Sequence, residues 1–130
     1  MKVELNHTIV HVKNKKEAAH FLADLFELPE PEPFYAFLMV RLEHGASLDF
    51  LETDEPFQVQ HYAFLIGEKK FDKIYEKIQK RNIRHWADPG KSQPGKINTY
   101  FGGRGVYFED PSGNLLLEII TKPYGNEGEE

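Results

Sequence analysis

The two halves of this 130-residue chain repeat one order of features, and this internal repeat limits the possible folds more than any other property of the sequence. Each half opens with a strand-like segment, residues 6–10 and 60–64, that holds a histidine in second position. Each half closes with an apolar segment that a single acid interrupts, Asp49 in the first and Glu118 in the second. Such a repeat indicates two copies of one supersecondary unit.

The spacing of apolar residues in the first half predicts one helix and several strands. The helix begins at Asn14, which can form a capping box with Glu17, and it continues to about residue 27. Three prolines at 29–33 then form a stiff connector that no helix or central strand could hold. One strand of this half is only weakly indicated, and the clear ones are residues 2–12, 34–42 and 47–52.

The second half shows the same order of elements. Apolar residues at helical spacing predict a helix over residues 68–81. A long polar loop at residues 88–103 and a type I turn at 110–113 separate the later strands. The expected strands are residues 60–66, 84–87, 104–109 and 115–121.

We therefore expect an α+β fold with a single domain over residues 1–125. Two strand–helix–strand–strand–strand modules would build it, at about residues 3–55 and 58–122. Residues 123–130 are rich in glycine and glutamate, and we expect them to form a flexible tail.

The composition excludes several classes of function. The formal net charge of −5 argues against a nucleic-acid module, whose affinity depends on neutralising phosphates. No apolar run approaches the ~20 residues of a membrane span, and the first residues lack the apolar core of a signal peptide. We expect a soluble cytoplasmic protein without a membrane partner. Since the chain has no cysteine, nitrogen and oxygen atoms must hold any metal.

The candidate site residues are the acids and histidines of the repeat. A lone strand histidine is usually structural, but His7 and His61 occupy equivalent positions, and a packing role has little reason to recur. Glu118 lies in an apolar strand, where an unpaired carboxylate is costly to bury, so it must face a cation, a donor or water. Asp49 suits a ligand role or a solvated strand edge equally well.

Two imidazoles and one carboxylate with open positions suit iron(II), whereas a second carboxylate suits octahedral nickel, cobalt, manganese or zinc. Such an ion can polarise a carbonyl or enediolate oxygen, activate water, or chelate substrate beside dioxygen. The residue set therefore predicts a site for a divalent metal and a small-molecule substrate.

Three motifs resemble the vicinal oxygen chelate superfamily, which includes glyoxalase I, type I extradiol dioxygenases, fosfomycin-resistance enzymes and bleomycin-resistance proteins. They are residues 5–7, residues 60–64, and residues 106–114 leading to 117–119. The resemblance implies two βαβββ modules that form a cupped mixed sheet around one divalent metal ion per chain, usually in a homodimer.

The same resemblance implies roles for individual residues. His7, His61 and Glu118 match the metal ligands of the family, and Asp49 lies where glyoxalase I has a fourth, glutamate ligand. Tyr107 matches a tyrosine that lines the substrate site. Acid–base catalysis would then fall to the Glu118 carboxylate or to Tyr107.

The sequence departs from the known subfamilies at several points. Ile9 stands where fosfomycin enzymes have threonine or cysteine, and residues 92–108 lack the acid–base histidine of extradiol dioxygenases. Glu118 follows Asp110 by eight residues, one more than in most members. We expect a β-bulge to absorb the extra residue, because a one-residue slip would turn Glu118 away from the site.

These observations favour a metal-dependent enzyme that acts on a small oxygen-rich molecule by glyoxalase-like lyase or isomerase chemistry or by dioxygenase chemistry. The alternative is a metal-free protein that binds and sequesters a small molecule, as bleomycin-resistance proteins do. A dimeric scaffold without chemistry would leave the two strand histidines unexplained.

Overall fold

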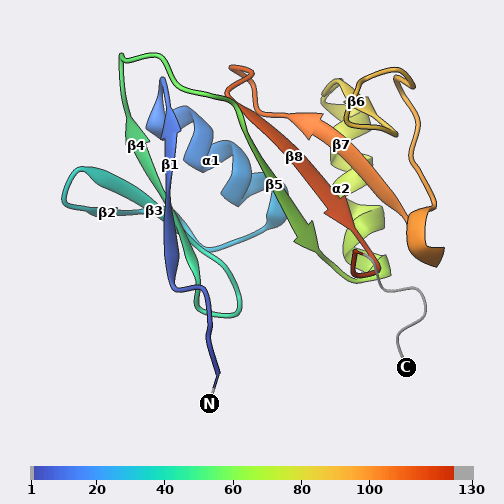
Figure 1. Ribbon diagram of the computed structural model, residues 1–130, viewed down its shortest axis with the longest axis horizontal. Coiled ribbons are helices and arrows are strands. Elements are labelled where there is room, and N and C mark those ends of the chain that lie inside the picture. The colour runs from blue at the N-terminus through green and yellow to red at the C-terminus, as the bar shows by residue number, and fades with distance from the viewer. Residues whose placement is uncertain (1, 125–130) are drawn as a thin grey trace. The chain divides into compact units, whose positions relative to one another are not determined.

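The computed structural model describes residues 2–124, which form two compact units (Figure 1). Among the described residues, the first unit comprises residues 2–58 and 110–114, and the second comprises residues 59–109 and 115–124. Each unit holds one helix and one four-stranded mixed sheet. Most of the expected C-terminal tail, residues 125–130, lies outside the described part of the chain.

The first unit has its strands in the order β1-β4-β3-β2, with β1 parallel to β4 and the other pairs antiparallel. Asn14 caps the helix, since its side chain accepts a hydrogen bond from the backbone N–H of Glu17 at 2.9 Å. The elements are β1 (His7–Val12), α1 (Lys15–Phe26), β2 (Glu32–Phe34), β3 (Phe37–Arg41) and β4 (Ser47–Glu52).

The second unit repeats this topology, with the order β5-β8-β7-β6 and a parallel β5–β8 pair. The elements are β5 (Gln60–Leu65), α2 (Glu68–Lys80), β6 (His85–Trp86), a 3₁₀ turn (Tyr100–Gly102), β7 (Gly105–Glu109) and β8 (Leu115–Ile120). The α+β fold of two βαβββ modules is therefore confirmed.

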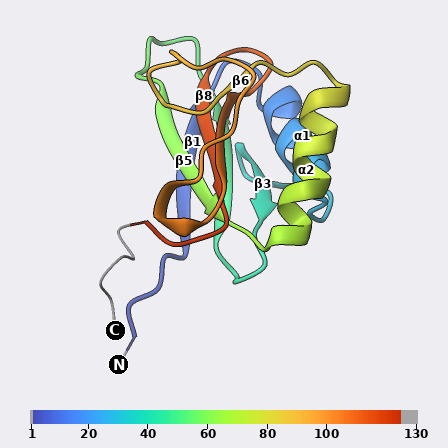
Figure 2. The same ribbon diagram turned by 90° about the vertical axis from the view of Figure 1, so that its right-hand side faces the viewer.

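Each sheet packs one face against its own helix. In the second unit Phe71, Ile74 and Ile78 of α2 are buried, and α2 lies along one face of the β5–β8–β7 sheet (Figure 2). Because side chains alternate along a strand, the residues between the helix-facing ones project from the opposite face. That second face carries His61, Tyr107 and Glu118, because Tyr107 pairs with Glu118 and His61 lies two residues from Ala63, the β5 partner of Glu118.

The proline-rich connector contains an edge strand that the sequence did not reveal. Residues 34–42 were expected to form one strand, but β2 ends at Phe34 and β3 begins at Phe37. Tyr35 turns the chain between them with a φ of 55°. Pro33 can pair here because β2 has a neighbour on one side only, so the missing N–H is not needed for a second ladder.

The first strand is shorter than expected. The alternation predicted residues 2–12, but β1 begins at His7. Its parallel partner β4 begins at Ser47, which lies opposite His7, and the Asn6 carbonyl accepts a hydrogen bond from the Ser47 N–H at 3.0 Å where this pairing begins. Alternation alone therefore overestimated this strand.

The prediction of a β-bulge before Glu118 is wrong. The β7–β8 ladder runs in continuous register from Gly105–Ile120 to Glu109–Leu116. The extra residue lies instead in the connection, where the backbone N–H of Gly113, at a φ of 71°, donates to the Asp110 carbonyl at 3.0 Å. Because a longer turn leaves the strand register intact, Glu118 still projects from the same face as His61.

Within residues 2–124, no helix is long and apolar enough to cross a bilayer.

The two helix N-termini should respond in opposite directions to substitution. Asn14→Ala removes the side-chain cap of α1 and should lower the free energy of unfolding by about 1 kcal/mol. Gly67 caps α2 without a side chain, at a φ of −77°, and a Cβ there would meet nothing within 4 Å. Gly67→Ser should therefore raise stability by a few tenths of a kcal/mol. Urea titration of both variants measures the two effects, and a stabilised Asn14→Ala variant would contradict this account of the caps.

Candidate metal site

A histidine and a glutamate meet on the open face of the second sheet. In the parallel β5–β8 pair, His61 lies opposite Leu116, and Ala63 lies opposite Glu118. The Nε2 atom of His61 is 3.0 Å from Oε1 of Glu118. The imidazole is 43% exposed, whereas the glutamate side chain is 2% exposed. The carboxylate is therefore held inside the sheet face, and the imidazole covers it from the solvent side.

The backbone determines which ring nitrogen of His61 is available. Nδ1 lies 3.0 Å from the carbonyl oxygen of Leu116, which can only accept, so Nδ1 carries a proton and donates it. In the neutral imidazole Nε2 then presents a lone pair toward the Glu118 carboxylate, which is also an acceptor. Two facing acceptors require a proton or a cation between them. Histidines that bind metals commonly have their other ring nitrogen fixed in this way.

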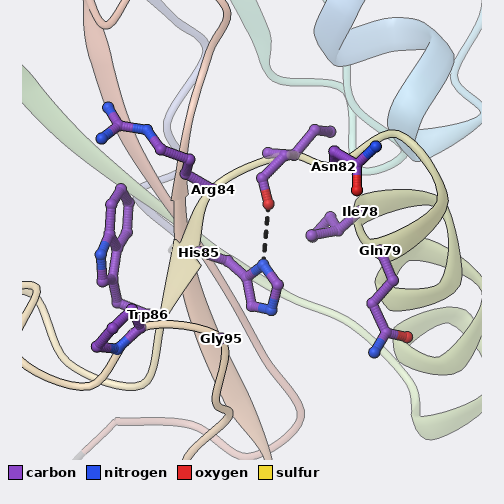
Figure 3. A pocket seen from close by; sticks show the side chains of 9 residues that line it. Ile78, Gln79, Asn82, Arg84, His85, Trp86 and Gly95 are labelled. Carbon is purple, nitrogen blue, oxygen red and sulfur yellow. Dashed lines mark hydrogen bonds between the residues drawn. The ribbon is translucent and has the colours of Figure 1, made fainter.

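His85 provides a contrast within the same unit. Its Nδ1–H donates to the Ile83 carbonyl at 2.9 Å, and its Nε2 accepts from the Tyr75 hydroxyl at 3.2 Å. Figure 3 shows this imidazole beside a hollow of about 510 Å³ between β6 and the end of α2. Both ring nitrogens of His85 have complementary partners, so it needs no cation. The hollow is therefore not the candidate metal site.

Glu118 needs a further positive partner. Its second oxygen, Oε2, is buried and has no hydrogen-bond partner among the described residues. Burying a carboxylate oxygen without a partner is costly, and a bound cation would remove that cost. The 3.0 Å separation between the nitrogen and Oε1 also suits neighbouring ligands of an octahedral ion, which lie about 3 Å apart at bond lengths of about 2.1 Å. These residues therefore fit a divalent metal.

Tyr107 completes this part of the sheet. It lies directly opposite Glu118 in the antiparallel β7–β8 pair, and its ring stacks on His61 with centroids 5.7 Å apart. Burial raises the pKa of its hydroxyl, and the negative charge of Glu118 and a side-chain hydrogen bond with Glu118 raise it further. Tyr107 is thus a protonated hydroxyl beside a carboxylate, able to donate a hydrogen bond to an oxygen atom of a ligand.

The register also shows a residue that the sequence analysis missed. Trp86 lies opposite Tyr107 in the β6–β7 pair, so the row across the sheet is Trp86, Tyr107, Glu118 and Ala63. Ala63, which lies opposite Glu118 at the β5 end of this row, carries only a methyl group. The sequence could have indicated Trp86 if the pairing of β6 with β7 had been known. A strand of two residues, however, is too short for its sequence to show which residue of β7 each one faces.

The first unit contains the equivalent positions. His7 lies opposite Ser47, and Ile9 lies opposite Asp49, so the histidine and the acid occupy the same register as His61 and Glu118. His7 is exposed, and its Nδ1 is 2.6 Å from the side-chain oxygen of Asn6. Asp49 is buried and accepts a hydrogen bond from the Ser47 hydroxyl at 2.7 Å. Ser47, which the sequence analysis also missed, thus partly satisfies this acid.

The structure brings the five expected residues together only in part. His61, Tyr107 and Glu118 meet in the second unit, whereas His7 and Asp49 belong to the first. Over residues 2–124, no three histidine, aspartate or glutamate side chains form a group that could hold a metal ion. The pair of His61 and Glu118 is therefore the part of the predicted site that the structure defines.

Comparison with known proteins places the chain among structures of this fold. It is similar to the structure of "Oxidase ChaP-H1", with 52% identity, a TM-score of 0.91 and coverage of 95% of this chain and 99% of that one. "Oxidase ChaP-H2" is similar at 46% identity and a TM-score of 0.91, with 96% and 98% covered. A search of curated proteins finds no match.

A more distant likeness shows the fold alone. A mutant of the fosfomycin resistance protein FosX from Listeria monocytogenes, complexed with Mn(II) and 1S,2S-dihydroxypropylphosphonic acid, has 19% identity and a TM-score of 0.72. The likeness covers 100% of both chains. The family model for the Glyoxalase/Bleomycin resistance protein/Dioxygenase superfamily matches residues 4–117. The chain belongs to this superfamily.

Proposed function

We propose that this chain is a metal-dependent oxidase that acts on a small oxygen-rich molecule. The observation that carries the proposal is the arrangement of His61 and Glu118. The Nδ1–H group of His61 donates to the Leu116 carbonyl, and this bond leaves Nε2 facing the Glu118 carboxylate. The other oxygen of this buried carboxylate has no hydrogen-bond partner among the described residues. This arrangement supports a cation site, because a bound cation would also give the second carboxylate oxygen a positive partner.

The proposed protein ligands are His61, Glu118 and His7. His7 is included because it occupies the same register position in the first unit as His61 does in the second. Two imidazoles and one carboxylate leave open positions for substrate and suit iron(II). Asp49 is a weaker candidate for a fourth ligand, since the Ser47 hydroxyl already donates to it.

The bound ion would polarise the oxygen atoms of the substrate and, if it is redox-active, allow electrons to pass to dioxygen. Tyr107 would orient the substrate, because its hydroxyl keeps its proton and can donate to a substrate oxygen. Glu118 would hold the ion or, when released from it, accept a proton from the substrate. His61 would exclude water from Glu118, because it covers the carboxylate from the solvent side.

Oxidase chemistry is favoured over lyase or isomerase chemistry by the two similar structures named as oxidases, at 52% and 46% identity over nearly the whole chain. In keeping with the family resemblance, we also propose that the protein acts as a homodimer.

Metal content tests the ligand set directly. Protein purified without chelator or affinity resin should contain about one divalent ion per chain. His61→Ala and Glu118→Gln should each reduce this content by at least about tenfold, since removing a ligand of a three-residue set removes most of the affinity. Elemental analysis by mass spectrometry provides the measurement, and iron would support the oxidase proposal.

His44→Ala is the matched control, because His44 is an exposed histidine in a turn of the first unit. It should leave the metal content unchanged. If His61→Ala and Glu118→Gln both retain the wild-type amount, the assignment is wrong. Bound nickel or zinc would favour isomerase or lyase chemistry instead, and a thermal shift with planar compounds but none with divalent ions would favour a sequestering protein.

The raised pKa of Tyr107 predicts a pH-dependent loss of stability in metal-free protein. The folded state keeps the proton at pH values where the unfolded chain releases it. The stabilisation is therefore complete below about pH 10, the ordinary pKa of tyrosine, and is lost as the pH rises through the higher folded value. Above about pH 10, the free energy of unfolding of the wild type should fall more steeply than that of Tyr107→Phe, by up to about 1.4 kcal/mol per pH unit.

Urea titrations of chelator-treated protein at several alkaline pH values measure the two slopes. Tyr62 and Tyr75, whose pKa values burial also raises, are present in both proteins and cancel in the comparison. Parallel stability curves for wild type and variant would show that Tyr107 ionises normally.

A further inference from the structure

Two exposed aromatic rings pack together beside Tyr107 in the second unit. Phe101 comes from the 3₁₀ turn, and Tyr124 comes from the segment that follows β8. Their ring centroids are 5.1 Å apart with planes inclined at 57°. Phe101 is 36% exposed and Tyr124 is 69% exposed, so much of the apolar ring surface faces solvent. We call Phe101 and Tyr124 the aromatic pair.

The backbone at Phe101 is strained. Its φ of 57° and ψ of 26° lie in the left-handed region, which costs a bulky residue of this kind about 1 kcal/mol or more. Such a conformation persists only where the surroundings enforce it. Phe101 is exposed and contributes little to the core, so the stability of the fold does not explain why a phenylalanine occupies this strained position. The contacts that its ring makes explain it better.

Buried Asn98 enforces this turn. Its side-chain oxygen accepts from the backbone N–H of Tyr100 at 3.1 Å, and its amide group donates to the Ala87 carbonyl at 2.8 Å. Its backbone exchanges two hydrogen bonds with Gly105, at 2.8 and 3.0 Å. The ring of Phe101 is thus presented by a fixed turn.

The segment that carries Tyr124 is hydrogen-bonded to the residues that follow the 3₁₀ turn. The backbone N–H of Arg104 donates to the Thr121 hydroxyl at 2.8 Å, and the N–H of Thr121 donates to the Arg104 carbonyl at 3.0 Å. Gly103 allows this approach, since a Cβ there would lie 2.6 Å from the Thr121 hydroxyl oxygen and 2.5 Å from the Lys122 side chain. Two segments distant in sequence are therefore joined where they present the aromatic pair.

The aromatic pair is continuous with the candidate metal site. The side chain of Tyr124 interacts with the hydroxyl group of Tyr107. The ring of Tyr107 in turn stacks on His61. Aromatic side chains thus lead from the solvent-exposed pair to the His61–Glu118 centre.

We propose that Phe101 and Tyr124 form a stacking subsite that binds a planar aromatic ring of the substrate while an oxygen atom on that ring reaches the metal centre. The proposal rests on the proposed function, because it assigns the substrate class of the same site. Exposed ring faces favour flat π-surfaces, which gain both burial and stacking, and a saturated molecule of the same size gains burial alone. Tyr107, placed between the subsite and Glu118, would donate to the ring-bound oxygen.

The test uses 2,3-dihydroxynaphthalene as a probe, since it combines a flat two-ring system with two adjacent oxygen atoms. Isothermal titration calorimetry measures its Kd for the wild type, Phe101→Leu and Tyr124→Leu, each in metal-loaded and in chelator-treated form. Both variants should weaken binding by roughly tenfold in both forms, because leucine keeps apolar contact but loses stacking. cis-1,2-Cyclohexanediol, which lacks the aromatic ring, should bind all three proteins equally weakly.

Phe34→Leu is the matched control. Phe34 is 49% exposed and packs edge-on against Tyr35 at a centroid distance of 4.6 Å in the first unit, so it is an exposed aromatic of the same kind outside the proposed subsite. It should bind the probe as the wild type does. Tyr124→Leu guards against misfolding, because it changes an exposed side chain beyond the last strand.

The subsite and the metal centre fail in different ways. The metal content of Glu118→Gln is measured first. This variant should bind the probe more weakly than the metal-loaded wild type does, but as strongly as the chelator-treated wild type does. Absence of metal in the wild type would overturn the proposed function, while the chelator-treated titrations would still report on stacking. Equal Kd values for wild type, Phe101→Leu and Tyr124→Leu would overturn the subsite, as would a wild type that does not bind the probe in either form.

Discussion

The buried carboxylate of Glu118 is the constraint on which the rest of the candidate site depends. It lies in an apolar strand at 2% exposure, and only one of its oxygens has a partner among the described residues. A buried charge of this kind persists only where a neighbour compensates it. His61 is bound to the Leu116 carbonyl through Nδ1, so its other nitrogen is held toward Glu118. The parallel β5–β8 register thus provides both the histidine and its orientation.

Much of the fold could be predicted because it depends on local patterns. The helices follow apolar spacing and caps, and the segment Ser47–Glu52 appears where alternation predicted it. The edge strand β2 was missed because prolines argue against strands in general, whereas the structure uses Pro33 where its missing N–H is not needed. The prediction of a bulge was wrong because a turn can lengthen by one residue without changing the strand register, whereas an extra residue within a strand would change it.

The site could be predicted as a set of residues but not as a geometry. Recurrence identified His61 and Glu118, whereas their position on one face follows from the strand register of the structure. Their hydrogen bonds depend on a backbone carbonyl at Leu116, which no side-chain pattern reveals. The aromatic pair was missed for a similar reason, since Tyr124 meets Phe101 only through tertiary contacts around Gly103.

Comparison of the two units shows how one register produces two different environments for an acid. In the first unit Ser47 occupies the position of Leu116, and its hydroxyl donates to Asp49. In the second unit Leu116 cannot donate from its side chain, so Glu118 keeps an unpartnered oxygen among the described residues. The neighbouring strand adds to the difference, since the larger Ile9 stands opposite Asp49 and the smaller Ala63 opposite Glu118. The repeated backbone is therefore retained in both units, while these substitutions leave the acid of the second unit with a buried oxygen that has no hydrogen-bond partner among the described residues.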